Sequence, residues 1–142
     1  MLQAMAVLSL LLAVPSPAAE VFLSITRSDI PVSDAPVNAS VVKADQAAET
    51  TAKTVADAIE GEPGIVIRRS GSVGASQFPS LRGFASKQVL IVIDDVPQVP
   101  DLTGNVDLAR LPLDQVERIE VLRGGASAVY GPNAEGGVIQ VV

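Results

Sequence analysis

The feature that most constrains this chain is a glycine-rich segment between two apolar runs near its C-terminus, VERIEVLRGGASAVYGPNAEGGVIQVV, residues 116–142. The apolar runs Ile119–Leu122 and Val138–Val142 have the composition of strands. The stretch between them holds five of the chain's eleven glycines, Gly124, Gly125, Gly131, Gly136 and Gly137. Because glycine permits positive φ and close backbone approach, the pattern predicts strand, turn, a short helix over 126–130, turn and strand.

A run of glycines beside Arg123 and Tyr130 could also cradle a phosphate. The segment has neither G-x-x-x-x-G-K-[ST] nor a G-x-G-x-x-G that opens a long helix, which argues against that interpretation. Another interpretation is that these glycines only form turns that allow the strands to pack. The glycines that we expect to be structural are Gly83, Gly124, Gly131, Gly136 and Gly137.

Composition excludes several classes of function. Hydrophobic residues make up 48% of the 142 residues but aromatic residues only 3%, so a core must be built from Val, Ile, Leu and Ala. The chain has no cysteine and no histidine, which removes disulfides, thiolate metal sites and the commonest general base. A net charge of −6 argues against a nucleic-acid partner, which needs a basic face. No spacing of the remaining polar residues presents a catalytic set, so the sequence predicts no enzyme, no cofactor and no metal site.

The first nineteen residues, Met1–Ala19, have the pattern of a signal peptide. The apolar run Ala4–Val14 is far shorter than the ~20 residues of a membrane-spanning helix. Two prolines and small residues follow it, and cleavage after Ala18 or Ala19 fits this pattern. No lysine or arginine precedes the apolar run, which departs from the usual signal.

The next segment, residues 20–38, begins with strand-forming residues and continues as a linker that contains Pro31 and Pro36. A short strand-forming segment on a tether suits β-augmentation, in which an extended peptide adds to the sheet edge of another protein. The other interpretation is that this segment is an ordinary edge strand of the domain itself. The residues proposed for strand addition are Glu20, Val21, Phe22, Leu23, Ser24, Ile25 and Thr26.

Residues 39–142 read as one α+β domain. Strands are expected at Ala39–Lys43 and Ile65–Ile67, and an amphipathic helix over Thr51–Glu60, with Thr50 or Thr51 as its N-cap. A core is expected from Val55, Ile59, Ile65, Ile67, Leu90, Val92, Ile119, Val121, Val129, Val138 and Ile139.

In the second half of the domain, Val89–Ile93 is continuously apolar, as in a strand that is covered on both faces. A sheet segment is expected to begin at Leu81-Arg82-Gly83, and a helix to follow Leu108 with Pro112 in its first turn. Asp94 and Asp95 favour a turn over a metal or acid–base pair, because adjacent strand residues point to opposite faces.

Residues 117–142 resemble the closing signature of the plug domain of TonB-dependent outer-membrane receptors. Leu81-Arg82-Gly83 and Val89–Pro97 resemble two earlier motifs of the same family. Gly125 and Gln140 replace the proline and asparagine that are usual in the signature, and Asp95 stands where glycine is usual.

The resemblance implies a small mixed sheet of about four strands, two or three short helices and long loops. It also implies roles. Residues 20–26 would form the TonB box. Arg82 and Arg123 would dock against the wall of a barrel and would be partly exposed on the isolated domain. The alternative is that each arginine pairs with an acid of the domain itself, such as Glu117 or Glu120. Two loops would face a metal chelate or cobalamin substrate, through Ser72, Val73, Ala75, Ser76, Gln77, Phe78, Gln98, Val99, Asp101 and Leu102.

The partners so implied are TonB with its inner-membrane complex, a β-barrel domain in cis or in trans, and the substrate. The family closes the lumen of an outer-membrane barrel and gates energy-coupled uptake of a scarce nutrient such as a ferric siderophore or cobalamin. No barrel-sized segment follows the signature within these 142 residues. A free periplasmic binding or adaptor module with a plug fold, or a fragment of a receptor, is the alternative.

Overall fold

The computed structural model of the chain describes residues 22–23, 30–31, 38–72 and 74–142. Its centre is a five-stranded sheet in the order β3-β8-β9-β6-β7. These strands are β3 (Ala39–Lys43), β6 (Val89–Ile93), β7 (Val96–Pro97), β8 (Arg118–Arg123) and β9 (Gly137–Val141). β6 and β9 run parallel and the other neighbours antiparallel. The predicted α+β class with a mixed sheet is confirmed, with five strands in place of about four.

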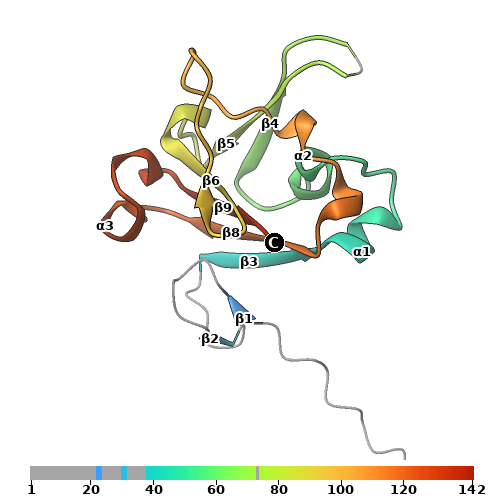
Figure 1. Ribbon diagram of the computed structural model, residues 1–142, viewed down its shortest axis with the longest axis horizontal. Coiled ribbons are helices and arrows are strands. Elements are labelled where there is room, and N and C mark those ends of the chain that lie inside the picture. The colour runs from blue at the N-terminus through green and yellow to red at the C-terminus, as the bar shows by residue number, and fades with distance from the viewer. Residues whose placement is uncertain (1–21, 24–29, 32–37, 73) are drawn as a thin grey trace, which may run out of the picture.

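Two smaller sheets flank the central one. β4 (Ile65–Arg69) and β5 (Gln77–Leu81) form an antiparallel hairpin. β1 (Phe22–Leu23) pairs with β2 (Ile30–Pro31), also antiparallel. In Figure 1 the hairpin stands above the central sheet, whereas β1 and β2 lie on the far side of β3.

The central sheet separates two hydrophobic cores, not one as expected. Because side chains alternate along a strand, Ile119 and Val121 of β8 face the larger core, which also contains the helices and the β4–β5 hairpin. The smaller core on the other face contains Leu90, Val92, Ala126, Ala134 and Val138. β6 serves both cores, which explains its continuous apolar run.

Val129 does not belong to either core, and its side chain is 48% exposed. It lies in α3 (Ser127–Tyr130), a helix of four residues. The contact with the smaller core comes instead from Ala126 before α3 and Ala134 after it, both buried.

Helix α2 (Val55–Ile59) is shorter than the helix expected over Thr51–Glu60, and a separate helix, α1 (Ala44–Ala48), precedes it. The N-cap of α2 is Thr54, not one of the two threonines expected. The Thr54 hydroxyl accepts a hydrogen bond from the Asp57 amide, and the Asp57 carboxylate accepts one from the Thr54 amide. This capping box fixes where the helix begins.

The helix expected after Leu108 is replaced by two 3₁₀ turns, Leu108–Arg110 and Leu113–Gln115. Pro112 lies between them as the N-cap of the second. Leu111 is extended because a residue before proline is disfavoured in the helical region. Further 3₁₀ turns occupy Ser86–Gln88 and Pro132–Ala134.

Two turns decide where the strands end. Asp94 and Asp95 both have positive φ, 45° and 65°, and form the two-residue turn between β6 and β7, as the sequence predicts. The expectation that a sheet segment begins at Leu81 is wrong, because Leu81 ends β5. Arg82 and Gly83 then turn the chain, also with positive φ.

The structural role expected for the glycines is clearest at Gly136 and Gly137. A Cβ on Gly137 would lie 2.2 Å from the carbonyl oxygen of Leu122, and its φ is +142°. A Cβ on Gly136 would lie 2.5 Å from the Cβ of Phe84. Gly83, Gly124 and Gly131 also have positive φ. Gly137 therefore allows β9 to pack closely against β8, and Gly136 allows the chain to pass close to Phe84.

Candidate functional site

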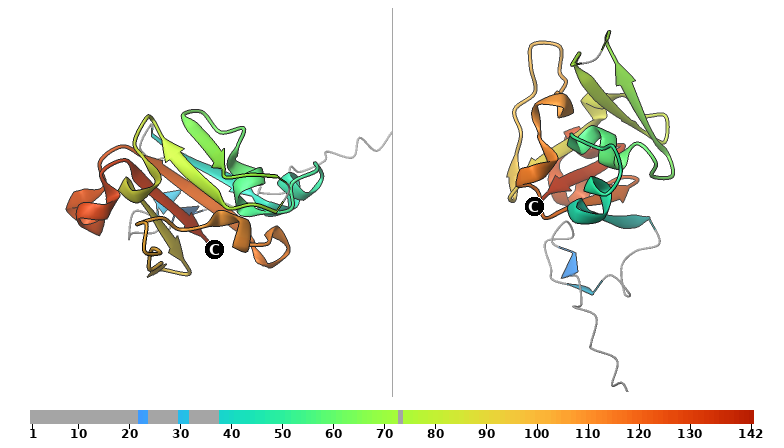
Figure 2. Two further views of the ribbon diagram at one scale, coloured as in Figure 1. Left: turned by 90° about the horizontal axis from the view of Figure 1, so that it is seen from above. Right: turned by 90° about the vertical axis from the view of Figure 1, so that its right-hand side faces the viewer.

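Two loops project from the same end of the domain. One joins β4 to β5 (residues 70–76) and the other follows β7 (residues 98–106). Figures 1 and 2 show both on the side of the molecule opposite β1 and β2. In the second loop, Val99 is 90% exposed, Leu102 is fully exposed and Asp101 is exposed. Ser72 is exposed in the first loop, and Val73 lies outside the described residues.

Not all residues expected in these loops lie in them. Gln77 and Phe78 belong to β5, where Phe78 is half-buried. Gln77 is buried, and its side-chain oxygen accepts a hydrogen bond from the Thr54 hydroxyl at 3.0 Å. Ala75 and Ser76 are half-buried at the base of the first loop. The Gln77 side chain therefore faces the domain and not the solvent.

Asp107 ties the bases of the two loops together, a residue that the sequence analysis did not single out. Its carboxylate accepts hydrogen bonds from the backbone N–H of Gln77 at 2.8 Å and of Ala109 at 3.0 Å. Burial disfavours the charged form, but these bonds and one from the Ser76 hydroxyl outweigh it, so the pKa of Asp107 lies below its ordinary value. The carboxylate thus positions one loop relative to the other.

We expect Asp107→Ala to lower the free energy of unfolding by about 1–2 kcal/mol, because it removes a cap and leaves the Gln77 N–H without its acceptor. Asp107→Asn keeps an acceptor and removes the charge. Because the folded-state pKa is depressed, the charge stabilises the protein above the ordinary carboxyl pKa of about 3.9 and loses this effect as the pH falls through the folded pKa. Urea melts of the wild type and of Asp107→Asn at several pH values measure this contribution of the charge. A wild-type advantage over Asp107→Asn that grows in acid would contradict it.

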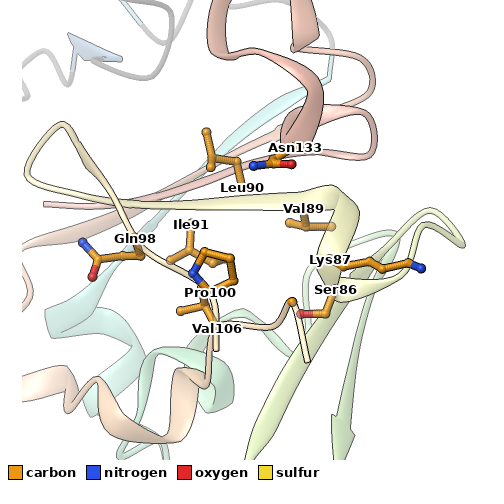
Figure 3. A pocket seen from close by; sticks show the side chains of 10 residues that line it. Ser86, Lys87, Val89, Leu90, Ile91, Gln98, Pro100, Val106 and Asn133 are labelled. Atoms are coloured by element: carbon orange, nitrogen blue, oxygen red, sulfur yellow. The ribbon is translucent and has the colours of Figure 1, made fainter. Parts of the chain in front are cut away.

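Two cavities adjoin the loops. One of about 240 Å³ lies beneath the 98–106 loop, against β6. Figure 3 shows its lining from Val89 and Ile91 on one side and Pro100 and Val106 on the other, with the Lys87 side chain extending away from them. The lining is mixed, because Ser86, Lys87, Gln98 and Asn133 accompany the apolar side chains. The volume is below the 300 Å³ or more that is typical of whole small-molecule sites. The cavity is therefore large enough only for part of a larger ligand.

The second cavity, of about 580 Å³, lies between the 70–76 loop and the start of α2. Its charged lining includes Arg69, which donates to both oxygens of Glu60 at 2.6 and 2.7 Å and to Asp57 at 3.3 Å. The Arg69 guanidinium lowers the pKa of Glu60. Arg69 is thus already balanced by two carboxylates of the domain, so this cavity offers no unpaired arginine to an anion.

The two arginines expected to face a barrel differ. Arg82 is exposed, and its Nη2 donates to Asn38 Oδ1 at 2.9 Å. Arg123 is only 7% exposed and forms an ion pair with Glu62 at 2.7 Å. The expectation that both arginines are partly exposed is therefore wrong for Arg123. An acid of the domain is its partner, as the alternative interpretation held, but that acid is neither Glu117 nor Glu120.

Those two glutamates pair with Arg118 instead. Arg118 lies 3.1 Å from Glu117 and 2.9 Å from Glu120, which is fully buried. Arg118 and Glu120 are two residues apart on β8 and so share a face of the sheet. This alternation was readable from the sequence, whereas nothing local in the sequence identifies Glu62 as the partner of Arg123.

The proposed TonB-binding residues are described only in part. Phe22 and Leu23 are extended in β1. Glu20, Val21, Ser24, Ile25 and Thr26 lie outside the described residues, as does the expected signal peptide. The extended backbone at Phe22 and Leu23 is the conformation that strand addition requires.

Comparison with known proteins identifies the domain. Residues 31–138 match the TonB-dependent receptor plug domain family. The vitamin B12 transporter BtuB of Vibrio vulnificus is 33% identical over 122 residues, which are 86% of this chain and 20% of that protein. The BtuB of Photobacterium profundum is 31% identical, over 82% of this chain and 19% of that protein.

Solved receptors share the fold. The ferric enterobactin receptor PfeA of Pseudomonas aeruginosa, crystallised with enterobactin, matches with a TM-score of 0.61 and 28% identity, over 75% of this chain and 17% of that chain. The ferric yersiniabactin uptake receptor FyuA of Yersinia pestis matches with a TM-score of 0.55 and 29% identity, over 73% of this chain and 16% of that one. This chain belongs to the TonB-dependent receptor plug domain family. It spans about a fifth of the length of the curated relatives quoted.

The relatives quoted are named as transporters or receptors, and none as an enzyme. Within the described ranges, no group of three or more acidic side chains could hold a metal ion. In the same ranges, no helix is both long and apolar enough to cross a bilayer.

Proposed function

We propose that this chain is the plug of an outer-membrane receptor and gates the energy-coupled uptake of a scarce nutrient, cobalamin or a ferric siderophore. The observation that carries the proposal is the arrangement of a plug-family domain with two exposed loops at one end and β1 and β2 at the other. One end can thus meet a substrate while the other meets an energy-transducing protein. Residues 1–19 would serve as a signal peptide and be removed on export.

In this proposal the plug sits inside a barrel, supplied in cis or in trans, and faces the periplasm. The loop residues available to the substrate are Ser72, Val99, Asp101 and Leu102, because they are exposed. Among the described residues of the two loops there is no lysine or arginine. This neutral to acidic surface favours a substrate without strong negative charge, and cobalamin fits it better than an anionic ferric chelate.

Arg82 is the arginine that we propose for docking to the barrel. It is exposed, and its guanidinium donates to the neutral side chain of Asn38, so it has the capacity to pair with a carboxylate of the barrel wall. Residues Glu20–Thr26 are proposed to pair with the C-terminal domain of TonB as an added strand, for which main-chain hydrogen bonds give the affinity.

Uptake and binding can be separated in cells that carry the gene for this protein. Leu23→Pro removes a backbone donor from the proposed strand, far from the loops, so we expect surface binding of substrate to remain and uptake to fall at least about tenfold. Leu23→Val keeps the donor and is the matched control. Radiolabelled cyanocobalamin and ferric enterobactin are the two probes. Unchanged uptake of both by the Leu23→Pro cells would contradict the proposal.

A further inference from the structure

Four segments that are distant in the sequence meet at the N-terminal end of β3. Asn38 and Ser40 come from the start of β3, Glu62 from the turn before β4, Arg82 from the end of β5 and Arg123 from the end of β8. The backbone N–H of Arg123 donates to the Asn38 carbonyl at 2.9 Å, and Arg82 Nη2 donates to the Asn38 side chain. The first residues of β3 are therefore held by side chains as well as by the sheet.

The tightest of these contacts form a closed triangle. Arg123 Nη2 donates to Ser40 Oγ at 2.9 Å and to Glu62 Oε2 at 2.7 Å, and the Ser40 hydroxyl donates to the same Glu62 oxygen at 2.7 Å. Arg123 Nε donates to the Pro63 carbonyl at 2.7 Å. Hydrogen bonds to charged, largely buried groups are stronger than those between neutral ones, so this cluster contributes more per contact than the sheet ladder.

The rest of β3 has fewer contacts than the inner strands, with Val42 only partly buried against the larger core and Ala39 and Val41 only partly buried against the smaller one. It is the edge strand of the central sheet and pairs with β8 alone. Its residues are half-buried or exposed, whereas Ile119 and Val121 of β8 and Ile139 of β9 are completely buried. Edge strands with little buried apolar surface are among the parts of a protein that open at low free energy. The polar triangle thus supplies a large share of what keeps β3 in place.

Along the chain, β3 is the first strand of the central sheet. Figures 1 and 2 place β3 between β1 and β2 on one side and the remainder of the domain on the other. A pull applied to the segment before Asn38 would load Asn38, Ala39 and Ser40 before the remainder of the central sheet.

We propose that Ser40, Glu62 and Arg123 form a latch that holds β3 on β8, and that β3 opens as a local unit when this latch is broken. Within the proposed function, on which its physiological meaning rests, the latch sets the resistance that a pull from TonB must overcome. After opening, Arg123 still holds Glu62 and Pro63, so the β4–β5 hairpin stays attached to the sheet while β3 leaves.

Native-state amide hydrogen exchange of the whole chain tests the latch, with three variants. In the wild type, the β3 amides that bond to β8 should exchange faster than those of β9. Ser40→Ala removes both hydrogen bonds of the Ser40 hydroxyl, so β3 exchange should rise at least about tenfold, which is the effect of losing one hydrogen bond to a charged group. Glu60→Gln, two residues from Glu62 but in an exposed ion pair with Arg69, is the matched control and should leave β3 exchange unchanged.

The third variant separates local opening from global unfolding. Ile139→Val shortens a completely buried side chain of β9, which stays packed when β3 alone opens. It should therefore speed exchange in β8 and β9 without affecting β3. Equal acceleration of β3 and β9 by Ile139→Val, or no acceleration of β3 by Ser40→Ala, would overturn the latch. These exchange rates are measured without TonB, so neither result contradicts the proposed function. Conversely, a failure to bind TonB would not contradict the latch.

Discussion

Gly137→Ala is expected to lower the free energy of unfolding of this chain by roughly 3–5 kcal/mol, because strain and overpacking act together. The new Cβ would lie 2.2 Å from the carbonyl oxygen of Leu122 and 2.5 Å from Leu81 Cδ2, and the φ of +142° is unfavourable for alanine. The backbone of β8 cannot give way without losing its bonds to β9, which pairs with it along its length. A loss of this size is a large part of the 5–15 kcal/mol that stabilises a typical domain.

Gly61→Ala is the matched control. It is the same chemical change at a position where an added Cβ meets nothing within 4 Å and no positive φ is needed. We expect a change within about 0.5 kcal/mol, as for ordinary surface sites. Urea denaturation followed by circular dichroism measures both variants. If the free energies of unfolding of Gly137→Ala and Gly61→Ala agree within about 1 kcal/mol, β8 and β9 are not packed as closely as described.

Arg123→Ala is expected to cost roughly 2–4 kcal/mol, somewhat less than the loss of a fully buried partner, because Glu62 retains some contact with water. The change leaves the Glu62 carboxylate, the Ser40 hydroxyl and the Pro63 carbonyl without the guanidinium that joins them. Arg123→Lys should recover part of the loss, since one ammonium cannot reproduce the fixed geometry of Nε and Nη2.

Arg82→Ala provides the comparison within the same chain. Arg82 is exposed, so its removal should change stability by less than about 0.5 kcal/mol. Urea melts of the two alanine variants therefore separate an arginine that serves the fold from one that is available for docking. If both variants lose an equally small free energy of unfolding, the result favours outward-facing side chains for both arginines.

Sequence reasoning was most successful where local chemistry decides the structure. The glycine-rich closing segment, β3, the continuously buried β6 and the Asp94-Asp95 turn follow from strand composition, turn residues and the tolerance of short polar residues for positive φ. The family follows from the same segments, because several ordered motifs at compatible spacing carry the resemblance.

Sequence reasoning failed where contacts with distant segments decide the local structure. The helix expected over Thr51–Glu60 begins late because the residues just before it pair instead with a distant stretch, the Leu113 N–H donating to the Lys53 carbonyl and the Val55 N–H to the Leu111 carbonyl. The helical periodicity of that stretch gives no sign of this pairing.

In the candidate site, too, local features were predicted correctly and features set by distant contacts were not. The exposed residues of the second loop were predicted correctly as loop residues, but Gln77 was not, because its burial depends on Thr54 and on the Asp107 carboxylate. Arg123 and Glu62 are 61 residues apart, so their pairing appears only once the sheet and the turn before β4 are placed together.

In the proposed function, TonB binds the N-terminal segment of this plug as an added strand. Isothermal titration calorimetry of the purified chain against the C-terminal domain of TonB tests it most directly. The wild type and Leu23→Val should bind alike, because both present the same main-chain donors, and Leu23→Pro should not bind, because it lacks the Leu23 N–H and fixes φ. Equal binding by the Leu23→Val and Leu23→Pro chains, or no binding by the wild type, would contradict the account.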